Sequence, residues 1–389
     1  MTTPDRPDVE TVNSVLVVGA SLAGSTVATA LREDGFTGRV TVVGDEPHLP
    51  YDRPPLSKAF LQGSAPDPWL VPEPDALDVD WVLGTPAVGM TGRSVELADG
   101  REVSADVVVI ATGARARTLL GADDLRGVHT LRTLDDAAAL RSSLATATTM
   151  VVIGAGFIGA EVASTAAGLG ISVTIVEAST APLSGPLGLT MAEVCVDLHR
   201  ANGVTLLLGA AVDSLEGRDG AVTSVLLGDG TVLPADVVVI GIGSIPNTEW
   251  AAASGLAIDG GFVTDAQCRT TVPGVYAIGD CARAFDEVLQ DHHRSEHWSH
   301  AVTQARRVAR SIVGAQPAPS GVPYFWSDQY GSRIQFAGRR QSTDSVRVVE
   351  GDPEAGSFVA VYERADDVVA VLAMNNARSF TRMRKSLGA

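Results

Sequence analysis

The sequence has no paired cysteines. Its three cysteines, Cys195, Cys268 and Cys281, lie far from one another along the 389 residues. This spacing excludes a C-x-x-C redox pair and gives no basis for a disulfide framework. Unpaired cysteines are typical of a reducing compartment, so we expect a cytoplasmic protein.

A long apolar run and an excess of basic residues are also missing. No apolar stretch reaches the ~18 residues of a membrane span, so we expect no membrane insertion. The formal net charge of −17 argues against nucleic acid or an anionic membrane as a partner of the whole molecule. The composition, with 45% hydrophobic residues, 19% charged residues and 40 glycines, is instead typical of a folded chain with many tight turns and two or three domains.

The sequence nearly repeats itself. The stretch VLVVGASLAGSTVATAL from residue 15 is echoed by MVVIGAGFIGAEVASTA from residue 150, and SADVVVIATGA is echoed by PADVVVIGIGS. Gly19 and Gly154 are 135 positions apart, and Asp106 and Asp236 are 130 apart. Each copy has a β-branched run, a glycine-rich turn, an alanine-rich helical stretch and a second strand, which is a βαβ unit. We therefore predict an α/β fold with two related, parallel-sheet domains.

The pattern changes after Gly243. A strand ending in Gly279 and Asp280 is followed by a helix, expected over about residues 299–314, and by the proline-rich stretch GAQPAPSGVP. Beyond this linker, stretches such as SFVAVYER and DVVAVLAMN alternate apolar and polar residues, which predicts antiparallel strands. We therefore expect a small α+β domain over about residues 321–389.

The second repeat carries the motif Gly154-x-Gly156-x-x-Gly159, with Glu177 18 residues further on at a strand end. In a dinucleotide-binding βαβ unit the first glycine makes the turn, the second admits a pyrophosphate, and the third packs helix on strand. The acid binds ribose hydroxyls, and its charge repels a 2′-phosphate. We predict an NADH site that disfavours NADPH; the alternative is a glycine turn of an unrelated α/β protein.

The first repeat reads Gly19-x-Ser21-x-x-Gly24, with Asp45 and Glu46 after the next strand. Ser21 replaces the second glycine, and we expect its hydroxyl to donate to a pyrophosphate. One of the two acids is expected to hold a ribose. Two dinucleotide sites on one chain predict a flavin and a nicotinamide, because hydride must pass between two cofactors.

These motifs give the chain a resemblance to a known family. The chain contains, in order, VVGASLAG, GDEPHLPYDRPPLSKAFL, VVIATGARART, LRTLDDA, VVIGAGFIGAEVA, GIGSIPN, VYAIGDCA, RSEHW and YFWSDQY. It resembles the putidaredoxin reductase-like family, the FAD-dependent NADH:ferredoxin reductases of bacterial oxygenase systems, which have the pyridine nucleotide-disulfide oxidoreductase fold. The proline-lysine stretch and YFWSDQY are the most specific of these motifs.

The resemblance implies two Rossmann-like domains, an FAD domain with an inserted NAD domain, and a C-terminal domain that covers the flavin. The implied bounds are residues 1–116 and 245–320 for the FAD domain, 117–244 for the NAD domain and 321–389 for the C-terminal domain.

The resemblance also implies FAD contacts. Ala23 is expected at the pyrophosphate, Asp45 at the adenosine ribose, Arg132 at the phosphates and Asp280 at the ribityl chain. The residues themselves leave plainer alternatives open, with Asp280 as a helix N-cap and Arg132 as a surface arginine.

Two tryptophans complete the implied flavin site. Trp298 is expected near the pyrimidine end of the flavin, and Trp326 is expected to pack near the flavin from the C-terminal domain. Both also fit the plainer interpretation of a core aromatic. The remaining cofactor contacts that the resemblance implies come from Leu22, Arg53, Ala87, Ala111, Thr112, Gly113, Phe157, Ile158, Gly243, Gly279, Glu296 and His297.

Lys58 follows three prolines in the stretch PYDRPPLSKAF. The resemblance places it near flavin N5, paired with Glu161, and assigns these two residues to catalysis. A buried ammonium needs an anionic partner, and near N5 it would stabilise negative charge on the reduced flavin. A surface lysine after a proline turn is the alternative.

The missing cysteine pair bears on the electron acceptor. A disulfide reductase passes two electrons through a thiol pair, which this chain does not have. A flavin can take up two electrons and release them singly, so a two-iron ferredoxin is the expected partner.

A ferredoxin is usually acidic, so docking on this acidic chain needs a local basic face. Between residues 300 and 340 six arginines stand against a single acid, Asp328, and a basic run without acids follows residue 368. Salt-sensitive docking there is the hypothesis, and a solvated surface is the alternative. The basic residues are Arg306, Arg307, Arg310, Arg333, Arg339 and Arg340, followed by Arg378, Arg382, Arg384 and Lys385.

Four histidines crowd the stretch DHHRSEHWSH, at positions 292, 293, 297 and 300. His293 and His297 would share a face if the stretch were helical. No carboxylate or cysteine set accompanies them in register, and the stretch overlaps RSEHW, so we expect no metal.

The sequence therefore predicts a monomeric NADH:ferredoxin oxidoreductase with FAD that supplies an oxygenase, in particular a haem-thiolate monooxygenase. Two alternatives stay open at this point. One is a rubredoxin or small-molecule quinone reductase of the same fold, and the other is a redox-sensing NADH-binding flavoprotein.

Overall fold

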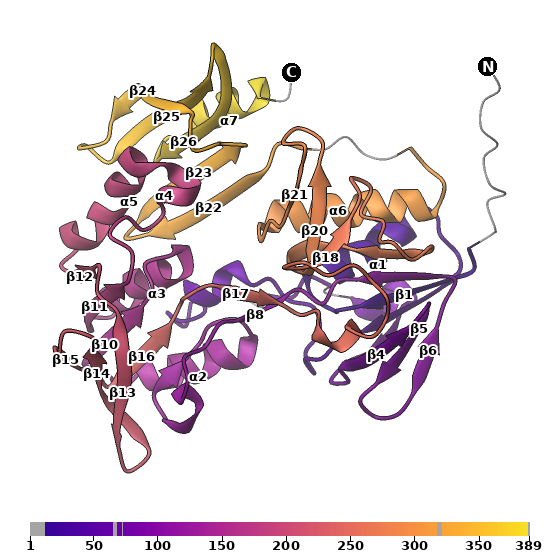
Figure 1. Ribbon diagram of the computed structural model, residues 1–389, viewed down its shortest axis with the longest axis horizontal. Coiled ribbons are helices and arrows are strands. Elements are labelled where there is room, and N and C mark those ends of the chain that lie inside the picture. Colours follow the sequence, from indigo (N-terminus) through magenta and orange to yellow (C-terminus); the bar gives the residue numbers. More distant parts are fainter. Residues whose placement is uncertain (1–11, 65–67, 72, 317–320, 388–389) are drawn as a thin grey trace. The chain divides into compact units, whose positions relative to one another are not determined.

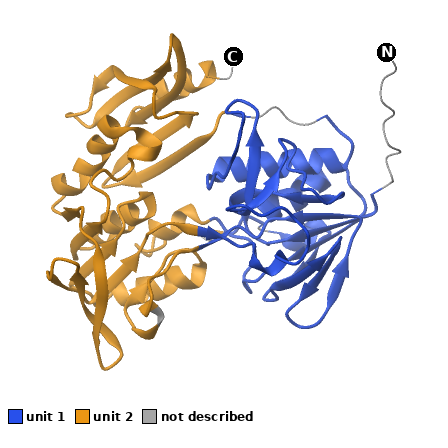
Figure 2. Cartoon of the chain, viewed as in Figure 1, with its two compact units in different colours: residues 1–52, 69–115, 245–321 blue, residues 53–68, 116–244, 322–389 orange. Residues whose placement is uncertain are grey.

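A computed structural model of the protein describes residues 12–64, 68–71, 73–316 and 321–387 (Figure 1). The chain divides into two compact units, shown in different colours in Figure 2. Unit 1 comprises Met1–Asp52, Trp69–Arg115 and Ile245–Gly321, and unit 2 comprises Arg53–Pro68, Ala116–Ser244 and Val322–Ala389. Residues 317–320 of the expected proline-rich linker lie outside the described residues.

Unit 1 is built on a five-stranded sheet whose neighbouring strands are all parallel, in the order β19-β7-β1-β2-β3. The strands are β1 (Ser14–Val18), β2 (Arg39–Val43), β3 (Asp80–Val82), β7 (Val107–Ile110) and β19 (Val275–Ala277). The VVVI sequence of β7 is buried at all four positions, as expected of a strand covered on both faces.

Successive residues of β1 alternate between two hydrophobic cores, one on each face of this sheet. Helices α1 (Leu22–Glu33) and α6 (Trp298–Ile312) cover the first face, where Leu31 and Val308 are fully buried. Two three-stranded sheets contribute to the second core. They comprise β4 (Ala87–Thr91), β5 (Ser94–Leu97) and β6 (Glu102–Ser104), and β18 (Phe262–Thr264), β20 (Ala282–Asp286) and β21 (Asp291–His293).

Unit 2 contains a second parallel five-stranded sheet, in the order β12-β11-β10-β16-β9. Its strands are β9 (Val128–His129), β10 (Thr149–Ile153), β11 (Ser172–Glu177), β12 (Thr205–Leu208) and β16 (Val237–Ile240). Helices α2 (Leu134–Leu144) and α3 (Phe157–Gly168) pack on one face through Leu140 and Val162.

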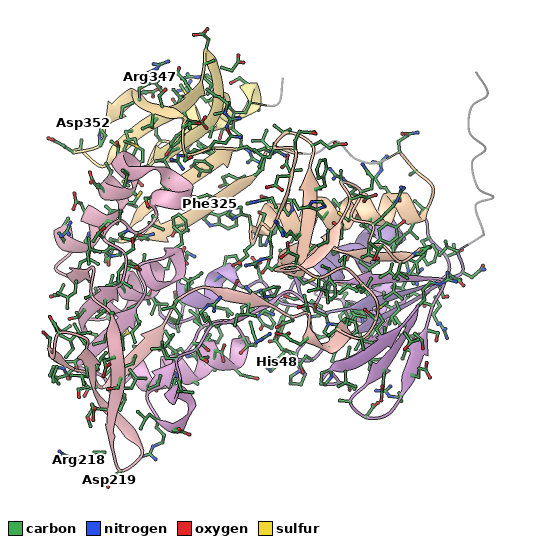
Figure 3. All side chains as sticks on the ribbon, in the orientation of Figure 1. His48, Arg218, Asp219, Phe325, Arg347 and Asp352 are labelled. Atoms are coloured by element: carbon green, nitrogen blue, oxygen red, sulfur yellow. The ribbon has the colours of Figure 1, made fainter. Side chains whose placement is uncertain are left out.

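The other face of this sheet is covered by an antiparallel sheet of β13 (Val212–Arg218), β14 (Ala221–Leu227) and β15 (Val232–Pro234). Figure 3 shows Arg218 and Asp219 at the tip of the β13–β14 hairpin.

The C-terminal part of unit 2 is an antiparallel sheet in the order β22-β23-β26-β25-β24, as the alternating sequence predicts. Phe380 of α7 (Ala377–Ser386) packs on one face. Leu187 and Met191, from α4 (Ser184–Leu187) and α5 (Leu189–Ala201), pack on the other. The strands are β22 (Tyr324–Gln329), β23 (Ser332–Gly338), β24 (Ser345–Asp352), β25 (Ser357–Arg364) and β26 (Asp367–Met374).

The structure also contains shorter elements. Strands β8 (Ala114–Ala116) and β17 (Ser244–Pro246) form a two-stranded sheet. The short 3₁₀ helices are η1 (Pro54–Ser57), η2 (Pro74–Leu77), η3 (Ala122–Asp124), η4 (Glu249–Ala251) and η5 (Gly279–Cys281). None of the helices in the described part of the chain has both the length and the apolar character that a membrane span needs.

Candidate functional site

The second glycine loop makes the turn from β10 into α3. Gly154 has a φ of +103°, and a Cβ there would lie 2.3 Å from the carbonyl oxygen of Gly241, so only glycine fits. A Cβ at Gly159 would lie 2.3 Å from the carbonyl oxygen of Gly154, where helix and strand meet. At Gly156, in contrast, a Cβ would meet no described atom within 4 Å. Space is thus open at the N-terminus of α3, where it fits a pyrophosphate.

Glu177 lies beside this loop at the end of β11. One of its carboxylate oxygens accepts a hydrogen bond from the Ala155 N–H at 2.8 Å, and the other accepts from the Ser179 N–H at 2.7 Å. The side chain is half-buried. These two hydrogen bonds fix the acid at the loop. Each carboxylate oxygen has a second lone pair, so the side chain can still accept from ribose hydroxyls.

The first glycine loop has the same backbone arrangement. The Gly19 N–H donates to the Val43 carbonyl at 2.7 Å, as the Gly154 N–H donates to the Val176 carbonyl at 2.8 Å. Ser21 stands half-buried before α1, and Ala23, in the first turn, is 8% exposed. This helix end also fits a pyrophosphate, with a hydroxyl at the position where the second loop has Gly156.

The two acids of the first loop differ in their surroundings. Asp45 is exposed, whereas Glu46 is half-buried and accepts a hydrogen bond from the hydroxyl of Tyr51. Tyr51 is itself buried and belongs to the proline-lysine stretch. Asp45 therefore has the more open carboxylate, whereas Glu46 is bonded to the stretch that follows, and the contact of Asp45 with a ribose stays a prediction.

The proline-lysine stretch folds into the short helix η1, which begins at Pro54. The Lys58 ammonium folds back to donate to the Pro54 carbonyl at 3.1 Å, and it lies 2.6 Å from a carboxylate oxygen of Glu161. The side chain of Lys58 is 20% exposed and that of Glu161 is 4% exposed. The expected ion pair is thus present, and the alternative of a surface lysine is wrong.

Further bonds hold Glu161 and the segment around Lys58. The Ser57 hydroxyl donates to the same Glu161 oxygen at 2.5 Å, and the Ser327 hydroxyl donates to the other oxygen at 2.6 Å. One turn along α3, the Thr165 hydroxyl donates to the Ser57 carbonyl at 2.8 Å. A buried carboxylate with this many donors has its desolvation compensated.

Arg53 and Arg132 are also brought together in unit 2. The Arg53 guanidinium donates to the Arg132 carbonyl, and the Arg132 N–H donates to Asp136 at 2.9 Å, next to a capping box at the start of α2. The Arg132 side chain is half-buried. The alternative of a surface arginine is therefore not supported, and its FAD contact stays a prediction.

Asp280 lies in η5 of unit 1 and is half-buried. Strand β20 follows η5 directly, and α6 begins only at Trp298, so Asp280 is not the N-cap of a helix. The Gly279 N–H donates to the Gln304 side chain at 2.8 Å. Burial lowers the pKa of His297, and the negative charge of Asp280 opposes this shift.

Neither tryptophan is a plain core aromatic. The Trp298 indole is 37% exposed and its N–H donates to Asp52 at 2.8 Å, which joins RSEHW to the proline-lysine stretch. Trp326 is half-buried on β22 and stacks on Tyr324, with 5.7 Å between the ring centroids. The guanidinium of Arg333 lies 5.9 Å from the Trp326 ring centroid.

The other expected cofactor contacts have mixed surroundings. The Phe157 ring packs on Phe325, labelled in Figure 3, at 4.9 Å within a hydrophobic core, whereas the neighbouring Ile158 is 49% exposed. Glu296 is exposed and paired with Arg294 at 2.5 Å. Thr112 donates to the Asn247 carbonyl at 2.8 Å. Leu22, Ala87, Gly113 and Gly243 are half-buried or exposed, and Ala111 is buried.

The histidine-rich stretch is not helical where its first two histidines stand. His292 and His293 lie on β21, and His297 precedes α6. Within the described ranges, no three His, Cys, Asp or Glu side chains come together as a possible metal site.

The three cysteines, all in the described part of the chain, are buried free thiols. Burial raises the pKa of Cys195 and of Cys268 to about 12, and it also raises the pKa of Cys281. Thiols with such pKa values stay protonated and unreactive at neutral pH.

The arginines of the expected docking face are distributed over both units. On α6, Arg306 pairs with Glu33 at 3.0 Å and Arg307 donates to the Ala266 carbonyl at 2.6 Å. In unit 2, Arg340 donates to the Gly185 carbonyl at 2.6 Å. Helix α7 carries four basic residues and no acid.

Sequence reasoning missed four polar residues of these sites. Asp52 and Ser57 stand inside the stretch that the sequence singled out, and Ser327 stands inside YFWSDQY. Gln304 is 3% exposed on the inner face of α6. The sequence signal that could have identified them is a polar residue inside a specific motif or on the apolar face of a helix.

Two family models match the chain. The model described as pyridine nucleotide-disulphide oxidoreductase matches residues 13–305, and the model described as reductase C-terminal matches residues 324–389. The chain is 38% identical to rhodocoxin reductase of Rhodococcus erythropolis over 96% of this chain and 89% of that protein. It is 36% identical to putidaredoxin reductase of Pseudomonas putida, over 96% and 91% of the two chains.

A solved structure agrees with these sequence matches. The covalent putidaredoxin reductase–putidaredoxin complex superposes with a TM-score of 0.92 at 35% identity, covering 97% of this chain and 93% of that chain. The matches span nearly the whole sequence. The chain therefore belongs to the pyridine nucleotide-disulphide oxidoreductase family.

Proposed function

We propose that this protein is an NADH-dependent, FAD-containing reductase that passes electrons singly to a two-iron ferredoxin. The observation that carries the proposal is the pair of glycine loops, each between a parallel strand and a helix of the same chain. One dinucleotide is expected at each loop. The ferredoxin then supplies an oxygenase, with a haem-thiolate monooxygenase as the end user.

The thiols support a one-electron acceptor outside the chain. The three cysteines are free and buried, and burial raises the pKa of each. A thiol relay needs a reactive thiolate beside a second sulfur, and these residues do not provide one. Free thiols also fit a reducing compartment, so a cytoplasmic location remains our proposal.

The chain's own residues bind and orient the two cofactors. The N-termini of α1 and α3 receive the pyrophosphates, with the Ser21 hydroxyl as an additional donor in the first loop. Asp45 and Glu177 accept from ribose hydroxyls, and Asp280 accepts from the ribityl chain. The Glu177 carboxylate, held by Ala155 and Ser179, disfavours a 2′-phosphate and hence NADPH.

Lys58 is proposed as the residue that tunes hydride transfer. When bound, the flavin takes up hydride from NADH and passes electrons on one at a time. Glu161 and the Pro54 carbonyl fix the Lys58 ammonium, so its positive charge is pre-organised where negative charge develops. No side chain has to act as nucleophile or general base.

Two basic surfaces are proposed to dock the acidic ferredoxin. One is the α6 surface, formed by Arg306, Arg307 and Arg310. The other is the α7 surface, formed by Arg378, Arg382, Arg384 and Lys385, where the helix has no acid. Charge reversal on either surface is expected to slow ferredoxin reduction more at low salt than at high salt. Rates that do not respond to either reversal would contradict the docking proposal.

The first test is NADH-dependent reduction of cytochrome c, measured with and without a two-iron ferredoxin while the flavin spectrum is followed. A large ferredoxin-dependent rate from a monomer is expected. Reduction of the flavin without a gain from ferredoxins, but with a gain from rubredoxin or a quinone, would favour the other reductases. Slow turnover with a long-lived charge-transfer band would favour the sensor.

A further inference from the structure

The C-terminal sheet contributes a hydroxyl to the Lys58–Glu161 ion pair. Ser327, on β22, donates to the Glu161 oxygen on the side away from Ser57, at 2.6 Å, and it is completely buried. Gln329, two residues further along the same strand, donates from its amide nitrogen to the Ser327 oxygen at 3.0 Å and is 1% exposed. Both residues lie on the buried face of a strand whose exposure alternates.

The hydrogen bonds in this group can run in one direction only. A carboxylate only accepts, so the single hydroxyl proton of Ser327 is committed to Glu161. The Ser327 oxygen must then accept, which requires the amide nitrogen of Gln329 to face it. Donation therefore runs from Gln329 through Ser327 to one oxygen of Glu161, while Lys58 and Ser57 donate to the other oxygen.

Core packing alone does not explain this arrangement. The Gln329 amide oxygen is buried and has no hydrogen-bond partner among the described residues. An unsatisfied buried carbonyl is costly, and apolar residues at positions 327 and 329 would pack in a core without that cost. Gln329 contributes an amide donor to Ser327, which in turn donates to Glu161.

We propose that Ser327, oriented by Gln329, is a positioning residue for Lys58. With donors on both oxygens, the Glu161 carboxylate cannot rotate and exchange them, so the ammonium keeps one place. This inference rests on the proposed function for its effect on hydride transfer, but not for its effect on the side chain of Lys58. It assigns the YFWSDQY motif a role in unit 2 besides that of Trp326.

The first test observes Lys58 by NMR. Its signal is easily assigned, because Lys58 and Lys385 are the only lysines of the chain. Protein labelled with ¹³C at the lysine ε-carbon gives two lysine signals, with exposed Lys385 as the internal reference. In wild-type holoenzyme without NADH, the two ε-protons of Lys58 should be inequivalent. Ser327→Ala should reduce the difference between the chemical shifts of these two protons and should shift the Lys58 signal. Gln329→Leu should have the same effects to a smaller extent. A Lys58 signal unchanged in both variants would overturn the proposal.

Two variants control for folding and for loss of any buried hydroxyl. Ser327→Thr keeps the donor and should keep the wild-type Lys58 signal. Ser379→Ala removes another buried serine of the same sheet region, which donates to Glu350 at 2.8 Å, and should also leave the signal unchanged. If Ser379→Ala shifted Lys58 as Ser327→Ala does, the effect would be general loosening and the proposal would be wrong.

Stopped-flow reduction of the flavin by NADH supplies the second readout. Ser327→Ala should slow the reduction step about 10-fold, as expected for loss of a hydrogen bond to a charged group, while the Kd for NADH changes less than about 2-fold. Equal changes in both parameters would contradict a positioning role. A wild-type flavin that NADH does not reduce would instead refute the proposed function, and the lysine signals would still decide the role of Ser327.

Discussion

The first and second βαβ units place the same backbone around different side chains. Gly19 and Gly154 bond equivalent carbonyls at the ends of β2 and β11. The residue after that carbonyl is Gly44 in the first βαβ unit and Glu177 in the second βαβ unit. Position 44 therefore has no side chain to hold the first loop, and the acid follows one residue later, exposed, at Asp45. A few substituted positions thus give the same backbone frame different side chains at its two loops.

The helices show the same divergence. Glu161 on α3 corresponds to Thr26 on α1, 135 positions earlier. The Thr26 hydroxyl donates to the Leu22 carbonyl of its own helix at 2.6 Å, whereas Glu161 bonds Lys58, Ser57 and Ser327. The second βαβ unit thus has a buried charge where the first has a hydrogen bond within its own helix. We propose that this position carries chemistry specific to the second βαβ unit.

A change that gives α3 the residue found at the corresponding position of α1 should have the largest effect. Glu161→Thr leaves Lys58 without its acid, and a misplacement of about 1 Å can cost about 100-fold in rate. We expect flavin reduction by NADH to slow by about 100-fold, measured by stopped flow. Lys58→Met combined with Glu161→Thr should regain thermal stability but not rate, because it removes the uncompensated charge. A double variant with a wild-type rate would contradict the assigned role of the pair.

Acid should affect unit 2 through a buried histidine of α5. His199 is 1% exposed, its Nδ1 lies 2.7 Å from the Tyr330 hydroxyl, and burial lowers its pKa to about 4. The unfolded chain binds the proton near pH 6.5, so stability is complete above that pH and falls as the pH drops toward 4. At pH 4.5 the loss should be about 2 to 3 kcal/mol.

Thermal melts of wild type and His199→Gln across pH 4.5–8 measure this contribution. The variant should lose less stability on acidification than the wild type. His293→Gln, at an exposed histidine on β21, is the matched control and should follow the wild-type curve. Parallel curves for wild type and His199→Gln would refute the assignment.

Glu177 is the charged residue that distinguishes the second glycine loop from the first, and removing its charge should have a smaller effect. Glu177→Gln keeps the size of the side chain but weakens its hydrogen bonds to ribose, so the Kd for NADH should rise about 10-fold. The preference for NADH over NADPH should fall with it, while FAD content stays unchanged. Fluorescence titration of both nucleotides measures the change. Glu216→Gln, at an exposed acid on β13, should leave both affinities as in the wild type.

The smallest expected effects come from two equivalent aspartates, one in each copy of the repeat. Asp106 accepts from the Asn13 and Ser14 N–H groups, and Asp236 accepts from the Thr148 and Thr149 N–H groups. These bonds lower the pKa of both acids, and that of Asp236 to about 2.

Each Asp→Asn change at these two positions should cost about 1 kcal/mol at neutral pH. The difference from wild type should start to shrink as the pH falls below about 4, where the unfolded-state acid takes up its proton, and should disappear only below the lower pKa of the folded-state acid. Chemical unfolding of Asp106→Asn and Asp236→Asn measures both. A clear cost in only one variant would show that the shared pattern does not serve both units equally.

The repeat and the β-branched runs predicted the parallel sheets because buried strands need an apolar sequence, as Val107–Ile110 and Val237–Ile240 show. The alternation after residue 321 likewise predicted the antiparallel sheet. The contacts of Glu161 were not fully predictable, because Ser57 and Ser327 lie 104 and 166 positions from it. Apolar patterning even argues against Ser327 and Gln329, since it favours apolar residues on the buried face of β22.

The order of the segments along the chain has a consequence during synthesis. The second parallel sheet uses strands between Val128 and Ile240, whereas the first waits for β19 and for the cover of α6, which ends at Ile312. We expect the second sheet to close first on the ribosome, although β1 leaves the ribosome earlier. Lys58 is then already available to Glu161, but Ser327 is not. We therefore expect Glu161 in the nascent chain to lack its second hydroxyl donor until β22 has left the ribosome.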